Sequence, residues 1–268
     1  MEGGTDMKVE MLSPEPYSDS LLKKLQDQDP TTMLGIVVAV LVILVTIVIL
    51  KIFWGRKSTR SAVLLVGLCD SGKTLLFSRL LTGKFRLTQT SITESSALYK
   101  PKNDTGSGLT LIDLPGHESL RPQCVEKFKS AARAIVFVVD SAVFQKEVRD
   151  VAEFMYSLLT DSVVAKNAPT LLVVCNKQDI TMAKSAKLIQ QQLEKELNTL
   201  RVTRSAALSA QDGSAGGASV YLGKKGKDFE FSQLPMRVEF VECSARGNKG
   251  DEGEAGIENL EKCLAKLV

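Results

Sequence analysis

Short apolar runs alternate with longer amphipathic stretches along the chain from residue 61 onward. The apolar runs have the length of buried strands, and they are residues 62–66, 109–114, 134–140, 170–176 and 238–243. The stretches that we expect to form helices are residues 74–81, 118–131, 145–160, 181–200 and 256–267. This alternation predicts an α/β fold with a doubly wound, mostly parallel sheet that binds ligands at the carboxyl ends of its strands.

A much longer apolar run precedes this pattern. Residues 31–50 carry no charged side chain. At about 1.5 Å per residue, such a run is long enough to cross a bilayer core of roughly 30 Å. Phe53 and Trp54 would suit the membrane interface, so we predict one transmembrane helix over residues 31–54. A cleaved signal peptide fits less well, because a long acidic segment comes first.

The charges on either side of the apolar run predict its orientation. Residues 1–30 carry three lysines and seven acidic residues, whereas residues 55–60 form a short basic linker. By the positive-inside rule, residues 1–30 form a short lumenal tail and the C-terminal part faces the cytosol. The cytosolic part is therefore basic, which would suit anionic lipid or ribosomal RNA, although we favour a generic solvated surface.

The predicted cytosolic domain, residues 61–268, contains one stretch that does not fit the alternating pattern. Residues 202–236 separate the expected helix 181–200 from the last strand, and they contain the sequences GSAGG and KKGK. Loops of this length are uncommon in compact domains. We interpret the stretch as an insertion and favour a solvated loop over a functional one.

The segment between the first strand and the first helix carries a phosphate-binding motif. Residues 67–74 read GLCDSGKT, which fits G-x-x-x-x-G-K-[ST]. Its glycines let backbone amides turn inward, and the following helix adds its electropositive N-terminus. Lys73 would reach the β- and γ-phosphates of a nucleotide. The predicted phosphate-binding residues are Gly67, Leu68, Cys69, Asp70, Ser71, Gly72, Lys73, Thr74, Leu75, Thr90 and Gly116.

A second motif, Asp-Leu-Pro-Gly at residues 113–116, ends the strand at 109–114. Its carboxylate would hold Mg²⁺ through water, and its glycine would let the backbone approach the γ-phosphate. Between the two motifs, residues 88–93 read TQTSIT, where a switch threonine would sense Mg²⁺. We choose Thr90 for this role and keep Thr93 as the alternative. The predicted magnesium site therefore consists of Thr74, Thr90 and Asp113.

Two further motifs predict that the base is guanine. Asn-Lys-Gln-Asp at residues 176–179 follows an apolar strand, and its aspartate can accept hydrogen bonds from N1 and the exocyclic amine of guanine. Adenine offers neither donor, so the carboxylate would stay unpaired and discrimination would be large. The predicted guanine-binding residues are Asn176, Lys177, Asp179, Ser244 and Ala245. The expected ligands are GTP and GDP with Mg²⁺, and a kinase or general ATPase is disfavoured.

His117 is the only histidine, and it directly follows the second motif. Many GTPases place at this position the residue that orients the attacking water, so His117 is a catalytic candidate with a structural role as the alternative. One histidine and five cysteines without a C-x-x-C pair argue against a zinc site. The odd number of cysteines also argues against a disulfide framework.

Over residues 61–268 these motifs resemble the Ras-like GTPases, most of all the ADP-ribosylation factor and Sar branch. GHESLRP at 116–122 and VFVVDS at 136–141 carry this resemblance, because the branch has an arginine at the offset of Arg121 and a strand ending in Asp-Ser or Asp-Cys. Sar-type members also have a histidine after the glycine. ADP-ribosylation factors start with a myristoylated glycine, whereas residue 2 here is Glu2.

With a spanning helix ahead of such a domain, the chain is similar to the family of signal recognition particle receptor β subunits. The sequences GLCDSGKT at 67–74 and LGKKGKDF at 222–229 strengthen this similarity. The resemblance implies a single-pass protein of the endoplasmic reticulum membrane. It also implies a heterodimer with the receptor α subunit, which docks on the switch regions in the GTP state for co-translational protein targeting. Ribosomes and the translocon would lie nearby, without direct sequence-specific nucleic-acid binding.

Three functions remain open on the sequence alone. The one we favour is a membrane-anchored GTP switch with slow hydrolysis, in which GTP orders residues 88–93 and 113–122 so that a partner binds. The second is a Sar- or ADP-ribosylation-factor-like GTPase that controls vesicle coat recruitment, which His117 supports and a fixed anchor opposes. The third is a membrane scaffold that binds nucleotide structurally and does not switch.

Overall fold

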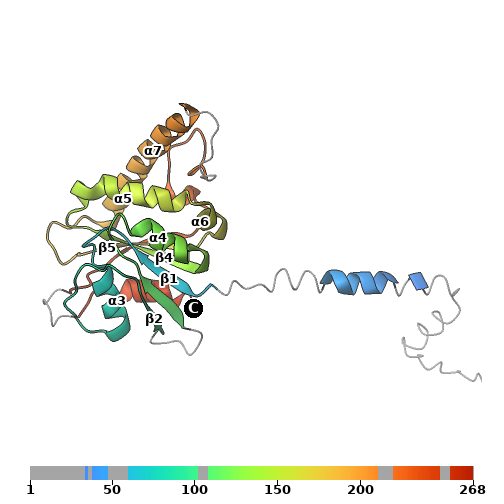
Figure 1. Ribbon diagram of the computed structural model, residues 1–268, viewed down its shortest axis with the longest axis horizontal. Helices are drawn as coiled ribbons and strands as arrows, with labels where there is room; N and C mark the ends of the chain where they lie inside the picture. Colours follow the sequence, from blue (N-terminus) through green and yellow to red (C-terminus); the bar gives the residue numbers. More distant parts are fainter. Residues whose placement is uncertain are drawn as a thin grey trace, which may run out of the picture. The chain divides into compact units, whose positions relative to one another are not determined.

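The computed structural model describes residues 34–35, 38–47, 60–101, 108–210, 220–247 and 254–267, and from 205 to 210 it describes the backbone alone. These residues belong to two compact units, Met1–Thr59 and Arg60–Val268 (Figure 1).

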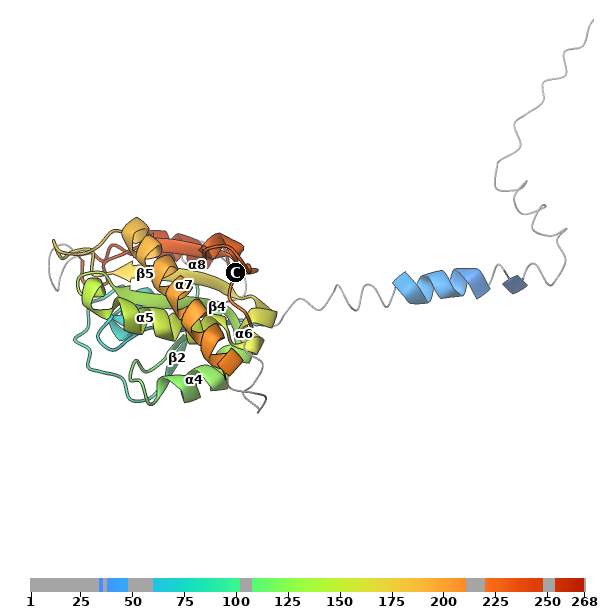
Figure 2. The same ribbon diagram turned by 90° about the horizontal axis from the view of Figure 1, so that it is seen from above.

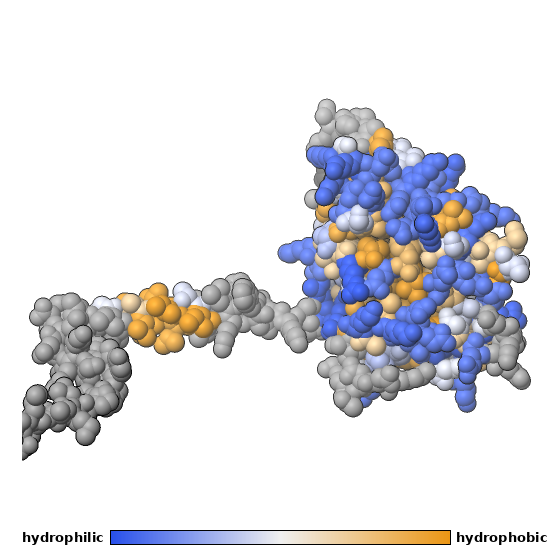
Figure 3. All heavy atoms as spheres, turned by 180° about the vertical axis from the view of Figure 1, so that it is seen from behind, coloured by the Kyte–Doolittle hydropathy of each residue, from blue (hydrophilic) through white to orange (hydrophobic). Residues whose placement is uncertain are grey.

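In the first unit, residues 34–35 and 38–47 are helical and their side chains are exposed. Figure 3 shows this helix with an almost entirely apolar surface. Its one hydroxyl is satisfied internally, because Thr46 Oγ1 donates to the carbonyls of Val42 at 3.0 Å and Ile43 at 2.8 Å. Within the described ranges, no helix is both long and apolar enough to cross a membrane. The rest of the predicted span, the tail and most of the linker lie outside the described residues.

One six-stranded sheet forms the centre of the second unit, in the order β2-β3-β1-β4-β5-β6. All neighbouring pairs are parallel except β2 with β3. The strands are β1 (Ala62–Val66), β2 (Ser95–Tyr99), β3 (Leu109–Asp113), β4 (Ala132–Asp140), β5 (Thr170–Asn176) and β6 (Val238–Glu242). The predicted α/β fold with a doubly wound, mostly parallel sheet is therefore confirmed.

Helices cover both faces of this sheet (Figures 1 and 2). One face packs Leu76 of α3 and Leu260 of α8 against the strands, and the other packs Phe144 and Met155 of α5 and Leu193 of α7. Each central strand is buried on both sides, which explains its continuous apolar sequence. The helices are α3 (Lys73–Thr82), α4 (Arg121–Phe128), α5 (Phe144–Leu159), α6 (Ser162–Asn167), α7 (Ala186–Ala210) and α8 (Glu258–Ala265), with short 3₁₀ turns η1 (Lys129–Ala131) and η2 (Phe231–Gln233).

Helix α7 differs in both bounds from the expected helix at 181–200. The backbone amide of Lys184 donates to the carbonyl of Ser141 at 2.9 Å, which holds this segment against the end of β4 as a turn. The helix starts at Ala186, whose amide donates to Glu242 Oε1 at 2.7 Å. At its other end α7 continues to Ala210, so the first part of the predicted insertion is helical.

The interpretation of residues 202–236 as a solvated loop is wrong for their second half. Leu222, Phe229, Phe231 and Met236 are all buried and belong to the same hydrophobic cluster as α5 and α7. The Phe231 ring also meets those of Phe229 and Phe240 edge-on, at centroid distances of 5.4 and 5.1 Å. Residues 220–236 are therefore a structural part of the domain.

Candidate functional site: a nucleotide-binding edge

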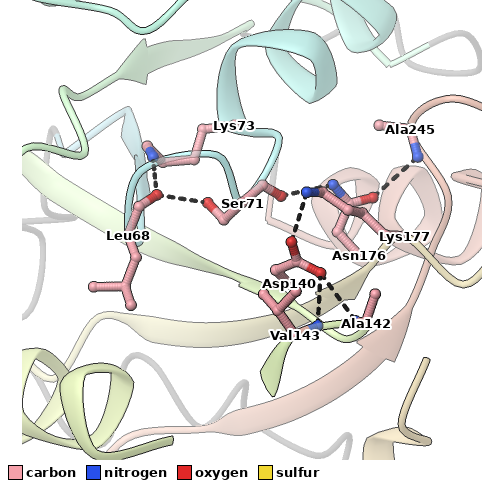
Figure 4. A network of polar contacts seen from close by, with 9 residues as sticks. All are labelled: Leu68, Ser71, Lys73, Asp140, Ala142, Val143, Asn176, Lys177 and Ala245. Carbon is pink, nitrogen blue, oxygen red and sulfur yellow. Dashed lines mark hydrogen bonds and ion pairs between the residues drawn. The ribbon is translucent and has the colours of Figure 1, made fainter. Parts of the chain in front are cut away.

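The phosphate motif forms a compact loop between β1 and α3. Lys73 Nζ donates to the carbonyl of Leu68 at 2.7 Å, and Ser71 Oγ donates to the same oxygen at 3.0 Å (Figure 4). Ser71 and Lys73 are both buried. Burial lowers the pKa of Lys73, and the carboxylate of Asp113 opposes this shift. The loop therefore holds a desolvated ammonium group that an anionic ligand would stabilise in its charged form.

The glycine of the second motif lies directly against this loop. A Cβ on Gly116 would stand 2.7 Å from Lys73 Nζ and 2.8 Å from the backbone nitrogen of Cys69. No larger residue fits without displacing the backbone, so Gly116 permits the close approach of the two motifs. The predicted approach of this glycine to a γ-phosphate stays a prediction. The two segments can respond together to a group bound between them.

Thr74 and Asp113 meet next to the loop. Thr74 Oγ1 donates to Asp113 Oδ2 at 2.7 Å and lies 2.8 Å from Ser91 Oγ. Burial raises the pKa of Asp113, against the opposing effects of the Thr74 hydrogen bond and the Lys73 charge. The second carboxylate oxygen, Oδ1, is buried without a hydrogen-bond partner among the described residues. A hydroxyl and a carboxylate are the oxygen ligands that Mg²⁺ prefers, so these residues fit that ion.

Asn176, at the end of β5, connects the phosphate motif to the last motif of the chain. Its Nδ2 donates to the carbonyl of Ser71 at 2.8 Å, and its Oδ1 accepts from the amide of Ala245 at 3.0 Å (Figure 4). Both bonds are buried. One side chain thus fixes the phosphate loop relative to the loop after β6.

The other residues of the NKQD motif are also held by polar contacts. Lys177 Nζ binds Asp140 Oδ2 at 2.5 Å, and the opposite carboxylate oxygen accepts from the amide of Ala142 at 2.9 Å. The carboxylate of Asp179 accepts from Ser244 Oγ at 2.6 Å. The position of Asp179, which would read the guanine edge, is therefore fixed in advance.

All four motifs accordingly converge at the carboxyl edge of one sheet, and comparison with known proteins gives the family. A family model described as the signal recognition particle receptor beta subunit matches residues 58–238. A signal recognition particle receptor subunit beta from Mus musculus is 67% identical over 254 residues, which cover 95% of this chain and 94% of that protein. The chain belongs to the family of signal recognition particle receptor β subunits.

Solved structures agree with this family assignment. The structure of the mammalian SRP receptor contains a chain that is 66% identical, with a TM-score of 0.67 over 77% of this chain and 100% of that one. The signal recognition particle receptor SRb-GTP/SRX complex from Chaetomium thermophilum gives a TM-score of 0.61 at 22% identity, over 77% of this chain and 100% of that one. At this lower identity the likeness shows the fold alone.

A cavity of about 230 Å³ lies beside the phosphate loop of this receptor β subunit family member. Residues 88–91, part of the predicted switch segment 88–93, border it. Thr90 is among the residues that line it and Thr93 is not. Ser91, which the sequence did not single out, contacts Thr74 directly. The lining residues are Cys69, Asp70, Gly72, Lys73, Thr74, Leu75, Thr88, Gln89, Thr90, Ser91 and Gly116.

His117 is exposed, and its ring is held within its own turn. Nδ1 lies 2.8 Å from Ser119 Oγ, and the carbonyl of His117 accepts from the amides of Leu120 and Arg121, both at 3.0 Å. The histidine therefore starts the helix-forming turn that leads into α4. Its predicted catalytic role stays a prediction.

Asp140 is a site residue that sequence reasoning missed. It carries the ion pair with Lys177 and also holds the turn after β4. The sequence contains a pattern that could have identified Asp140. It is the acidic residue that ends the apolar run at 134–140, as Asp113 ends its own strand. A charge at the end of a buried strand is what the two positions share.

Proposed function

We propose that this chain is a membrane-anchored GTP-binding subunit that, in its GTP state, holds the α subunit of the signal recognition particle receptor at the endoplasmic reticulum for co-translational protein targeting. The observation that carries the nucleotide part is the pair of buried bonds from Asn176 to Ser71 and Ala245, which joins the phosphate and base motifs into one site. Family membership supports the receptor part.

Different residues of the site would bind the phosphates, the Mg²⁺ ion and the guanine base. Lys73 and the backbone of residues 67–72 would hold the phosphates, and Thr74 with Asp113 would hold Mg²⁺, with Thr90 as the switch ligand. Mg²⁺ supplies positive charge that offsets the phosphate oxygens. Asp179, positioned by Ser244, would accept the two donors of guanine, while the amide of Ala245 would face the guanine oxygen. His117 would orient the water that attacks GTP, and we expect GTP hydrolysis to be slow.

A larger cavity of about 680 Å³ lies beside the phosphate site, and it fits the proposed docking surface. Its wall includes His117 and Arg121 of the switch segment 113–122 and Phe154 of α5. It also includes Cys69 and Gly116, which line the smaller cavity at the phosphate site as well. A change of the bound phosphates would therefore reach this surface through shared residues, which gives the partner a way to distinguish GTP from GDP.

The anchor in this proposal is the transmembrane helix at residues 31–54, with residues 1–30 in the lumen and the GTPase domain at 61–268 in the cytosol. It is supported by the uncharged run at 31–50 and by the basic linker at 55–60. A permanent anchor suits a resident receptor, because a spanning helix does not leave the membrane. Ribosomes and the translocon would then lie close to the domain.

Vesicle coat recruitment, the second candidate, rests on His117 alone and is not favoured by the family assignment. Pull-down from solubilised microsomes separates the two functions, with the full chain in detergent micelles loaded with GDP or a non-hydrolysable GTP analogue. We expect mass spectrometry to identify the receptor α subunit only with the GTP analogue. Coat components in its place would support the second candidate, and capture that is equal with both nucleotides would overturn the switch.

A further inference from the structure

A buried arginine fixes the loop that follows Val220. Arg201, near the end of α7, donates from Nη1 to the carbonyls of Leu222 at 3.4 Å and Lys224 at 3.2 Å, and from Nη2 to that of Lys227 at 2.6 Å. Gln233 adds two bonds to the same loop, accepting from the amide of Lys224 at 3.0 Å and donating to the carbonyl of Asp228 at 2.6 Å. The backbone of this loop is therefore held from inside. Its charged residues are exposed, and the carboxylate of Asp228 accepts from Asn198 Nδ2 of α7 at 3.0 Å.

The outward face of the loop combines positive charge with partly exposed apolar groups. Lys224, Lys225 and Lys227 are exposed, and none of them makes an ion pair with another described residue. The Tyr221 ring is 40% exposed, and its centroid lies 5.6 Å from Cζ of Arg201 and 5.7 Å from Nζ of Lys225. Val220 beside it is 43% exposed. Together these five residues, Val220, Tyr221, Lys224, Lys225 and Lys227, form what we call the basic patch.

The basic patch lies near the point where the second unit begins. Arg60, its first residue, donates from Nη1 to the carbonyl of Asn167 at 3.0 Å, at the end of α6. At the other end of this six-residue helix, the amide of Val220 donates to the carbonyl of Thr160 at 3.0 Å. A helix of this size is about 9 Å long. Lys166 on α6 is also exposed and adds positive charge between the two points.

We infer that the basic patch binds anionic phospholipid headgroups on the cytosolic surface of the membrane in which the chain is anchored. The inference rests on the proposed anchor, because the predicted linker at 55–60 spans at most about 20 Å when fully extended. With such an anchor, Arg60 would lie within about 20 Å of the bilayer surface, a distance over which the lysines would reach it. Each lysine near an anionic surface strengthens binding by about fivefold, and a tyrosine suits the headgroup layer.

The test compares the full chain in proteoliposomes of pure phosphatidylcholine with the chain in vesicles containing 30% phosphatidylserine. Hydrogen exchange of the backbone amides in residues 220–229 reports on contact with the surface. With anionic lipid we expect this exchange to slow by at least about threefold, consistent with several lysine contacts. Reversing the charge of the loop with Lys224→Glu, Lys225→Glu and Lys227→Glu should abolish the difference.

A matched control reverses the charge of three exposed lysines elsewhere on the domain by substitution with Glu. They are Lys146 of α5 and Lys187 and Lys195 of α7. In this variant anionic lipid should still slow the hydrogen exchange of residues 220–229. Identical exchange in both lipids, in a chain that still floats with the vesicles, would overturn the lipid site and leave the anchor intact. A chain that floats with neither vesicle would instead refute the anchor. Protection that arises in neutral vesicles only after ribosomes are added would overturn the lipid site and assign the patch to RNA.

Discussion

A Cβ atom on Gly72 would lie 2.4 Å from Nδ2 of Asn176. The amide that would be displaced is the one that donates to the carbonyl of Ser71, and its other end accepts from Ala245. Because both bonds are buried, the side chain has no room to turn away without breaking one of them. The phosphate loop and the base-binding loops are thus in contact through a single buried amide group.

Gly72→Ala should therefore weaken binding of GDP and GTP by at least about tenfold, since it adds this clash to the cost of a left-handed residue at φ 90°. Titration with a fluorescent GDP analogue measures the loss. Gly83→Ala is the matched control, because Gly83 has φ 69° but no atom within 4 Å of its would-be Cβ. It should cost about 1 kcal/mol of stability with unchanged nucleotide affinity. Equal affinity losses in the two variants would contradict the steric link.

Asp179→Asn should change which base the site accepts. A carboxylate accepts two hydrogen bonds, whereas an amide presents one acceptor and one donor, which matches the edge of xanthine and not that of guanine. We expect GTP affinity to fall at least about 100-fold and xanthosine triphosphate to become the better ligand in competition titrations. Ser244→Ala, which removes only the 2.6 Å bond to Asp179, should lower GTP affinity about tenfold without changing the base preference. Retained GTP preference in Asp179→Asn would remove this residue from the base site.

Asp161 should make folding stability depend on pH. It caps α6 by accepting from the amides of Val163 at 2.9 Å and Val164 at 3.0 Å, and it pairs with Lys129 at 2.7 Å. Partial burial would raise the pKa of Asp161, but these hydrogen bonds and the Lys129 charge outweigh it and lower the pKa. The stabilisation is therefore complete above the ordinary range near pH 4 and is lost as the pH falls through the lowered pKa of the folded state.

At pH 7 we expect Asp161→Ala to lower the free energy of unfolding by about 2 kcal/mol, because both the cap and the ion pair are lost. Asp161→Asn keeps a capping oxygen and should lose less. Urea unfolding between pH 3 and pH 7 should show the difference between the wild type and Asp161→Asn shrinking below about pH 4. Asp150→Asn, an exposed change on α5, is the control for removal of a carboxylate without loss of a cap. A constant difference across the range would contradict the assigned role of the charge.

His117→Ala tests the catalytic prediction. If the imidazole orients the attacking water, single-turnover GTP hydrolysis should fall at least about tenfold while nucleotide affinity changes less than about threefold. Ser119→Ala removes the hydroxyl that lies 2.8 Å from Nδ1 and frees the ring, so it should hydrolyse GTP at least as fast as the wild type. An unchanged rate in His117→Ala would leave the histidine with its structural role at the start of the α4 turn.

The sequence predicts the elements of this fold best where a buried strand is followed directly by a nucleotide-binding motif. The strands β1 and β5 have the predicted bounds because every residue of β1, and all but the first of β5, is buried, which requires an uninterrupted apolar run. The motifs at 67–74 and 176–179 follow these strands directly. A parallel sheet brings such segments to one edge, so their proximity could be inferred before any coordinates were known.

The elements that were missed carry no such pattern. Strand β2 lies at the edge of the sheet, and only Tyr99 among its five residues is buried. Helix α6 is too short to show a helical period. The contact of Ser91 with Thr74 and the burial of Leu222, Phe229, Phe231 and Met236 depend on tertiary packing that local sequence does not encode.

The contacts of Arg201 also bear on how the domain can be engineered. They hold the start of the 220–236 segment on α7, the same helix from which residues 211–219 depart. Both ends of that connection are thus fixed independently of its length. Lengthening such a connection costs only about 0.6 kcal/mol for each doubling. An epitope or a fluorescent reporter inserted after Ala210 should accordingly leave the contacts of Arg201 and the packing of residues 220–236 in place.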